Sequence, residues 1–182
     1  VMGQSSQDRM LHVAPLFHCA QLVIYLLPAF YLGMTNVIHR EFNPVNVLKD
    51  IEKYKITLFF GVPTMYNYLL QVPNAEVYDL SSVRGCAYGA APMPPEILTK
   101  SMKLFNTNQF YSLCGLTEGG PTGLYLSPED HEQHLGKTGK TPLLYTVIKV
   151  VNKKYEEVLP GEVGELILKG ETIMKEYYKK PK

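Results

Sequence analysis

Short apolar segments alternate with helix-forming segments through the first two-thirds of the chain, and this alternation constrains the fold most. The apolar segments predict strands near 9–13, 35–39, 57–60, 83–87 and 108–112. The segments between them predict helices near 19–32, 44–54, 63–71 and 94–105. Several of these helices open with Pro or with an Asn, Ser or Thr cap. The pattern predicts an α/β fold with a mostly parallel sheet flanked by helices, which places ligands at the carboxyl ends of the strands.

The pattern changes after residue 128. Segments 145–151 and 163–168 are typical of strands, and a polar turn at 152–154 follows the first of them without a helix. We therefore expect an α/β subdomain at 1–128, which carries the turns described next, and a small β-rich subdomain at 129–182.

Three turns that carry chemically useful side chains each follow an apolar segment. They are PLFH at 15–18, YGAAPMPPE at 88–96, and a glycine-flanked turn within 111–121 that holds Thr117 and Glu118. A hydroxyl beside a carboxylate on such a turn suits a metal-bound phosphate. The three turns in this order along the chain form a more specific sequence signal than any one of them alone.

Each turn also has a structural interpretation. The Gly and Pro residues of 88–96 are typical of a strand-to-helix connection, since Gly permits positive φ and Pro suits a first helical turn. Thr117 and Glu118 would satisfy free backbone amides at a helix start. His18, in an apolar stretch, would be a hydrogen-bonded core histidine.

Taken together, the motifs resemble those of the adenylate-forming enzymes, which include acyl-CoA synthetases, luciferases and peptide-synthetase adenylation domains. PLFH is similar to the motif whose histidine lies between the acyl pocket and the thiol tunnel. YGAAPMPPE resembles the loop against adenine, and GLTE at 115–118 resembles the motif that meets the phosphates. LGKTGKT at 135–141 and the segment 160–181 match further family segments, whose roles are mostly structural. Within this family, the motifs resemble those of bacterial fatty-acid-CoA ligases more than those of amino-acid-activating domains.

This resemblance implies roles for particular residues. Thr117 would contact the α-phosphate and Glu118 would hold Mg²⁺, which makes them the catalytic candidates. The implied nucleotide-binding residues are Gly89, Ala90, Ala91, Pro92, Cys114, Gly115, Leu116 and Thr117. The implied acyl and CoA site consists of His18, Tyr88 and Gly89.

Cys114 departs from the family pattern, which usually has an aromatic residue stacked on adenine at this position. Stacking of a base on an aromatic ring contributes about 1–3 kcal/mol in nucleic-acid binding, so the affinity for nucleotide would be lower here. Phe110 or Tyr111 would replace the ring only if its side chain reached the same face. Alternatively, Cys114 acts as a small apolar residue that widens the acyl pocket.

The resemblance implies an ATP-dependent ligase that joins a fatty acid of long or medium chain to coenzyme A through an acyl-adenylate. ATP, Mg²⁺, coenzyme A and a carboxylic acid are the implied partners. An aromatic-acid-CoA ligase and a non-catalytic nucleotide- or acyl-binding protein are the alternatives. The family's phosphate loop, ribose-binding segment and catalytic lysine are not found, so we expect a central fragment of the large N-terminal domain, inactive and self-associating in isolation.

Composition limits the remaining possibilities. A formal net charge of +1 gives no reason to expect nucleic acid. Three widely spaced cysteines are typical of reduced thiols in a cytoplasmic protein. The apolar run 20–32 is shorter than the roughly 20 residues of a membrane-spanning helix and predicts a buried helix. Peripheral membrane contact would suit a fatty-acid enzyme, although no basic amphipathic helix supports it. His131 and His134 are predicted to lie in a solvated loop rather than to bind zinc.

Overall fold

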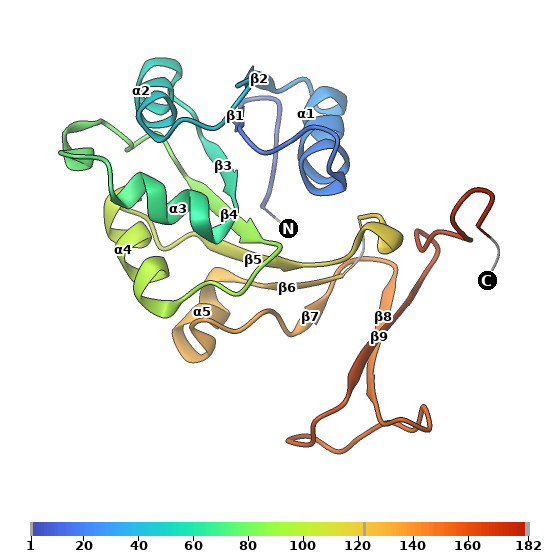
Figure 1. The fold of residues 1–182 in the computed structure, drawn as a ribbon. Coiled ribbons are helices and arrows are strands. Elements are labelled where there is room, and N and C mark those ends of the chain that lie inside the picture. Colours follow the sequence, from blue (N-terminus) through green and yellow to red (C-terminus); the bar gives the residue numbers. More distant parts are fainter. Residues whose placement is uncertain (1, 122, 181–182) are drawn as a thin grey trace.

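A seven-stranded sheet forms the centre of the fold (Figure 1). The structure is a computed structural model that describes residues 2–121 and 123–180. The strands of the sheet are β1 Arg9–His12, β2 Thr35–Ile38, β3 Leu58–Gly61, β4 Gly85–Gly89, β5 Phe110–Cys114, β6 Leu124–Leu126 and β7 Thr141–Pro142. They lie in the order β2-β1-β3-β4-β5-β6-β7. The first five strands pair in parallel, whereas β6 and β7 are antiparallel. The predicted α/β fold with a mostly parallel sheet is confirmed.

Helices connect these strands, and Pro opens most of them. The helical elements are η1 Ala20–Leu26, α1 Leu27–Tyr31, α2 Pro44–Tyr54, α3 Pro63–Leu70, η2 Ala75–Val77, α4 Pro95–Phe105, η3 Thr117–Gly119 and α5 Pro128–His134. In α2 the fixed φ of Pro44 suits the first turn, and the Asn43 side chain accepts a hydrogen bond from the Asn46 amide. The sequence therefore specifies where this helix begins.

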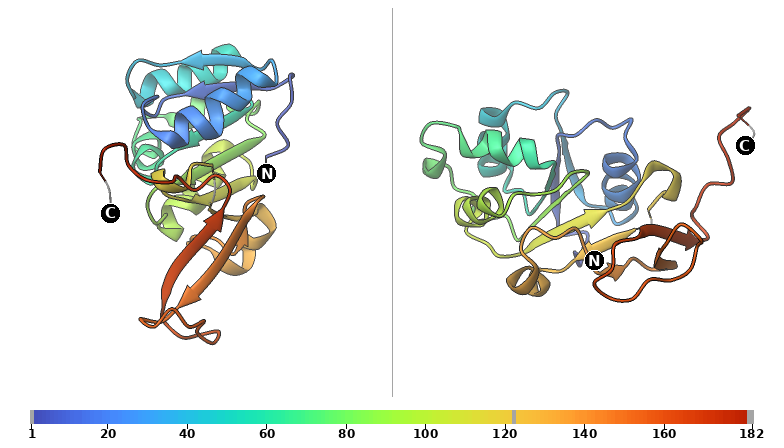
Figure 2. Two further views of the ribbon diagram at one scale, coloured as in Figure 1. Left: turned by 90° about the vertical axis from the view of Figure 1, so that its right-hand side faces the viewer. Right: turned by 60° about the horizontal axis from the view of Figure 1, so that its bottom comes forward.

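The helices cover both faces of the sheet. Helices α2, α3 and α4 pack on one face, whereas η1 and α1 pack on the other (Figure 2). On the first face, Ile51, Tyr66 and Phe105 are almost completely buried. On the second face, Tyr25 and Phe60 stack with ring centroids 4.7 Å apart. Each such side chain contributes roughly 1.5–3 kcal/mol by leaving water, so the sheet is held between two apolar layers.

The helix predicted at 19–32 differs from the expectation in two ways. Its first part, η1, is a π-helix, and α1 is an α-helix of five residues. Only one side is buried, because Leu27, Phe30 and Tyr31 are 51%, 61% and 91% exposed. An apolar run this short does not distinguish a buried helix from one that covers a sheet with a single face.

A separate two-stranded antiparallel sheet follows, with β8 at Thr146–Val151 and β9 at Glu165–Gly170. Both strands are near their predicted positions. The main sheet, however, extends past the predicted boundary at 129, because β7 pairs with β6. Two residues of β7 give no periodic signal in the sequence. The division into subdomains 1–128 and 129–182 stays a prediction.

An ion pair and a hydrogen bond to the same carboxylate link the amino ends of β1, β3 and β4. Asp8 is 3% exposed, and Nε and Nη2 of Arg84 each donate to one of its carboxylate oxygens at 2.7 Å. The Thr57 hydroxyl donates to Oδ1 of the same carboxylate at 2.8 Å. The bond from Arg84 lowers the pKa of Asp8 to about 2. This end of the sheet is therefore closed by paired groups.

No helix in the described part of the chain is long and apolar enough to cross a membrane.

Candidate functional site

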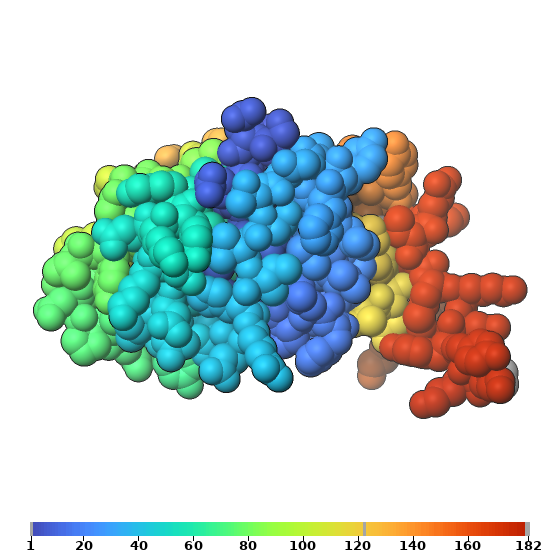
Figure 3. All heavy atoms as spheres, turned by 90° about the horizontal axis from the view of Figure 1, so that it is seen from above, coloured from blue at the N-terminus to red at the C-terminus, as the bar shows by residue number. Residues whose placement is uncertain are grey.

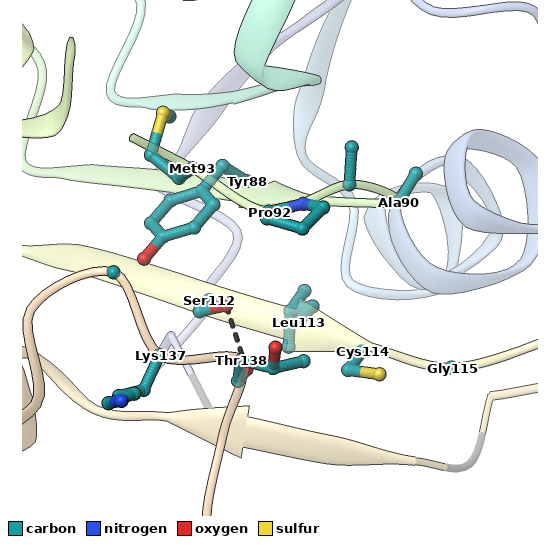
Figure 4. Close-up of a pocket in the computed structure, with 12 residues that line it drawn as sticks. Tyr88, Ala90, Pro92, Met93, Ser112, Leu113, Cys114, Gly115, Lys137 and Thr138 are labelled. Carbon is teal, nitrogen blue, oxygen red and sulfur yellow. Dashed lines mark hydrogen bonds between the residues drawn. The ribbon is translucent and has the colours of Figure 1, made fainter. Parts of the chain in front are cut away.

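Two adjoining cavities lie at the carboxyl ends of β4 and β5. The smaller has a volume of about 200 Å³ (Figure 4), and the larger has a volume of about 360 Å³. The residues that line both are Ala90, Leu113, Cys114 and Gly115. Because β4 and β5 are parallel neighbours, the motifs that follow them meet at this edge of the sheet.

The turn after β4 forms one wall of the smaller cavity. Ala90, Ala91 and Pro92 line it and are exposed. Ala90 has a φ of 66°, a conformation that costs a residue with a side chain of order 1–3 kcal/mol and that clusters at ligand sites. A Cβ on Gly89 would lie 2.3 Å from the Leu113 carbonyl oxygen. Gly89 itself does not have a positive φ, so the expectation that it supplies one is wrong. Its missing side chain instead permits the close approach of β4 and β5, and Ala90 has the strained conformation.

The floor of the smaller cavity contains a buried tyrosine held by a histidine. The Tyr88 hydroxyl lies 2.9 Å from Nε2 of His131, and Nδ1 of His131 lies 2.6 Å from the Ser127 carbonyl oxygen. Since a carbonyl only accepts, Nδ1 carries the proton and Nε2 accepts from Tyr88. Burial lowers the pKa of His131. His131 is thus a neutral residue that orients Tyr88.

The predicted solvated loop around His131 and His134 is wrong. These residues lie in α5, and His131 is 2% exposed. The sequence contains the signal for this helix. Ser127 is an N-cap that accepts from the Asp130 amide, Pro128 follows it, and acidic residues occupy the first turn. No group of three or more metal-ligating side chains occurs among the described residues.

Residues 136–138 form the opposite wall of the smaller cavity. The Ser112 hydroxyl on β5 donates to the Thr138 carbonyl oxygen at 2.9 Å (Figure 4). Lys137 also lines the cavity and is exposed. The resemblance implies a mostly structural role for the segment 135–141, so these residues are not among the predicted site residues. Hydrogen-bonding of a β5 side chain to a distant loop leaves no signal in the sequence.

His18 lines the larger cavity and is exposed. Its Nδ1 accepts from the Ala20 amide at 3.1 Å. The core histidine is instead His12, which is 0% exposed. Its Nδ1 lies 2.6 Å from the Gln21 side-chain nitrogen, and its Nε2 lies 2.7 Å from the Asn36 oxygen. The structural interpretation of His18 is therefore wrong, and its side chain is accessible to a ligand.

Thr117 and Glu118 also line the larger cavity. They lie within η3, a three-residue 3₁₀ helix whose N-cap is Leu116 and lacks a side-chain cap bond, so Thr117 does not cap a helix. The Cys19 thiol lies 3.9 Å from the Thr117 hydroxyl. The Tyr177 hydroxyl donates to Oε1 of Glu118 at 2.6 Å, which lowers the pKa of Glu118. Glu118 is therefore ionised at neutral pH.

Glu118 fits a site for Mg²⁺. It is the one Asp or Glu among the described residues that line the larger cavity. Mg²⁺ is a hard cation that takes one or two protein carboxylates together with phosphate oxygens and water. A single ionised carboxylate beside a cavity suits that donor set.

Cys114 lines both cavities and is partly buried. Phe110 is a core residue on the face covered by α2, α3 and α4, and Tyr111 packs on the other face. Neither is among the described residues that line the two cavities, so neither ring replaces the missing aromatic side chain. Because Cys114 borders both cavities, its predicted effects on nucleotide affinity and on pocket width both stay open.

The structure brings all the predicted site residues together around these two cavities. They are His18, Tyr88, Gly89, Ala90, Ala91, Pro92, Cys114, Gly115, Leu116, Thr117 and Glu118. Their individual roles stay predictions. Cys19, Tyr25 and Tyr177 are not among the predicted site residues. Cys19 directly follows the PLFH turn in the sequence, whereas only the tertiary structure brings Tyr25 and Tyr177 beside the motifs.

The chain matches a family model and known proteins over nearly all of its length. The family model described as AMP-binding enzyme matches residues 1–178. The chain is 35% identical over 177 residues to feruloyl-CoA synthase from Amycolatopsis sp, covering 97% of this chain and 35% of the relative. It is 32% identical over 180 residues to long-chain-fatty-acid CoA ligase from Bacillus subtilis (strain 168), covering 96% of this chain and 31% of the relative.

A solved structure has the same fold. O-succinylbenzoate coenzyme A synthetase from Bacillus subtilis, in complex with ATP and magnesium ion, superimposes with a TM-score of 0.83 at 32% identity. The match covers 97% of this chain and 36% of that one. The chain thus spans about a third of the length of the curated relatives it matches. The family match and the similarity to these ligases and to the solved structure show that the chain belongs to the AMP-binding enzyme family of adenylate-forming proteins.

Proposed function

We propose that the protein carrying this chain is an ATP-dependent acyl-CoA synthetase that activates a fatty acid of medium or long chain. The observation that carries this proposal is the meeting of Thr117 and Glu118 with the turn 89–92 around two cavities that share Cys114. One cavity provides a place for a nucleotide, and the other provides a place for the acid and the phosphates. The relatives of the chain include a feruloyl-CoA synthase and a long-chain-fatty-acid CoA ligase, which supports the proposal.

The proposed reaction has two steps. An oxygen of the substrate carboxylate attacks the α-phosphorus of ATP, the bond to the bridging oxygen of the β-phosphate breaks, and pyrophosphate leaves. The thiol sulfur of coenzyme A then attacks the acyl carbon and AMP leaves, while the thiol proton passes to solvent. Phosphoryl transfer depends on positioning and charge neutralisation more than on covalent help from the protein.

The residues of this chain would contribute mainly electrostatic stabilisation. The Thr117 hydroxyl, which is exposed in the cavity, would donate to an α-phosphate oxygen as negative charge develops there. The Glu118 carboxylate would hold Mg²⁺, which when bound neutralises phosphate charge. His18 would line the path between the acid and the thiol.

The lining of the larger cavity supports a plain alkyl acid. Ile24, Phe60, Leu113 and Leu143 contribute apolar surface to it. The described lining residues include no Lys or Arg that would pair a second carboxylate. An extended hydrocarbon chain gains free energy in proportion to the apolar area it buries there.

A specific observation favours an aromatic acid as the second candidate. Tyr25 lines the larger cavity and is 2% exposed, and its hydroxyl has no hydrogen-bond partner in the part of the chain that the structure describes. A buried hydroxyl without a partner costs roughly 1–3 kcal/mol, which a hydroxyl or methoxy group on an aromatic substrate would recover. The relative named feruloyl-CoA synthase agrees with this candidate.

The test is ATP–pyrophosphate exchange by the complete protein with Mg²⁺, using alkyl, aryl and amino acids. Exchange that depends on an alkyl acid supports the proposal, and preference for an aryl acid of similar size supports the second candidate. Absence of exchange from a folded protein that still binds ATP would favour a non-catalytic nucleotide- or acyl-binding role. We also propose a cytoplasmic location, since Cys19, Cys86 and Cys114 are free thiols.

A further inference from the structure

The segment 171–178 lies against the η3 turn, although more than 50 residues separate them in sequence. The Met174 amide donates to the Glu118 carbonyl oxygen at 2.8 Å, and the Thr172 hydroxyl donates to the Gly119 carbonyl oxygen at 3.0 Å. In the left view of Figure 2 the dark red end of the chain crosses the yellow turn, and Figure 3 shows red and yellow atoms side by side. The segment is thus anchored to the backbone of the turn.

A third contact from this segment reaches a side chain of the candidate site. The Tyr177 hydroxyl donates to Oε1 of Glu118 at 2.6 Å. A hydrogen bond to an ionised acceptor is stronger than one between neutral groups. A carboxylate has about four lone-pair sites on its two oxygens, so this bond leaves acceptor capacity for a cation.

Core packing does not explain the position of the Tyr177 ring. Tyr177 is 51% exposed, and its bond to Glu118 is its side-chain hydrogen bond in the structure. The adjacent Tyr178 is 86% exposed, and its hydroxyl has no hydrogen bond to any described residue. Of these two neighbouring tyrosines, Tyr177 hydrogen-bonds to Glu118 and Tyr178 does not.

We propose that Tyr177 is a positioning residue that fixes the Glu118 carboxylate for Mg²⁺. The inference rests on the proposed function, in which Glu118 holds the metal. The anchors at Met174 and Thr172 place the tyrosine, and its hydroxyl restricts the rotation of the carboxylate. Partners of this kind, one step removed from the metal, typically affect metal affinity by 10–100-fold when mutated. The segment 171–178 thereby becomes part of the phosphate end of the site.

The experiment compares ATP binding by the complete protein in MgCl₂ and in EDTA, measured by calorimetry. The ratio of the two affinities isolates the contribution of the metal. Tyr177→Phe is expected to reduce that ratio by about 10-fold or more, while ATP binding in EDTA stays unchanged. Tyr178→Phe is the matched control, and its ratio should equal that of the wild type. A Tyr177→Phe variant that weakens binding equally in both conditions would overturn the proposal, because it would show a general structural defect.

Glu118→Gln separates this inference from the proposed function. If Glu118→Gln reduces the ratio and Tyr177→Phe does not, Glu118 keeps its metal role and the positioning role of Tyr177 is wrong. If neither variant changes the ratio, the metal role of Glu118 fails, and the inference fails with it. In the double variant, Tyr177→Phe should add no further loss, and an additional loss would mean that Tyr177 acts independently of Glu118.

Discussion

The two ends of the parallel strands differ in how their polar groups are paired. At the amino ends, Asp8 is buried and takes bonds from Arg84 and Thr57. At the carboxyl ends, Thr117 is exposed and Ala90 has positive φ. A group whose bonds are all satisfied within the protein has little capacity for a ligand. The same sheet is thus stabilised at its amino end and left available for binding at its carboxyl end.

Substitution of Glu118, at the carboxyl end of the sheet, should cause the largest loss of activity. Glu118→Gln removes the negative charge that would hold Mg²⁺, and we expect acid-dependent ATP–pyrophosphate exchange to fall by about 1,000-fold. The fold should be intact, as circular dichroism would show. Glu132→Gln, at an exposed position on α5, is the control with normal exchange. Unchanged turnover in Glu118→Gln would remove Glu118 from the metal role.

Substitution of Arg84, at the amino end of the sheet, should reduce stability and leave activity unchanged. Arg84→Ala leaves the Asp8 carboxylate buried without its cation, and we expect the free energy of unfolding to fall by about 3 kcal/mol. This is the low end for a buried pair, since the Arg84 side chain is 44% exposed. Urea denaturation measures the change, and exchange activity per folded molecule should persist. Lys100→Ala breaks the exposed pair with Glu96 and should have no measurable effect. Equal losses of unfolding free energy in Arg84→Ala and Lys100→Ala would contradict the stabilising role of the buried pair.

Substitution of Cys114 should have a smaller effect, on the affinity for ATP. Cys114→Tyr introduces the aromatic ring usual in the family, and we expect ATP binding to tighten by about 10-fold through stacking on the base. Cys114→Leu adds bulk without a flat ring and should not tighten binding. If both variants weaken binding of the acid and leave ATP affinity unchanged, Cys114 belongs to the acyl pocket instead.

The smallest effect concerns acid pH. The pKa of Asp8 is lowered from 3.8 to about 2 by Arg84, so the unfolded chain binds a proton more readily than the folded one. The stabilisation is present above pH 3.8 and is lost as pH falls toward about 2. The free energy of unfolding, measured across that interval, should fall less steeply in Arg84→Ala than in the wild type. Parallel curves would mean that other carboxylates dominate acid unfolding.

The sequence predicted the sheet and helices well where local signals were strong. Helix α2 was predicted with the bounds 44–54, because Asn43 caps it and Pro44 opens it. Prediction failed at η1, where an apolar run does not reveal a π-helix, and at β7, which has only two residues. Helix α5 was missed although Ser127 and Pro128 signal its start.

Only those site residues that lie within sequence motifs could be predicted. The motifs identified His18, Thr117 and Glu118 because each lies on a turn after an apolar strand. Tyr25 lies outside the motifs, and Tyr177 lies in the segment 160–181, for which the resemblance implies a mostly structural role. Their contributions depend on distances across the fold, such as the 2.6 Å bond to Glu118.

The family, the strand-and-helix alternation and the turns that carry the candidate side chains are all encoded in the amino-acid sequence. These features are local, since periodicity, capping and motif spacing act over a few residues. The tertiary structure decided which turns share a cavity, that His131 orients Tyr88, and that Tyr177 holds Glu118. Those contacts join distant segments, and their geometry is set by packing of the helices on the sheet rather than by neighbouring residues.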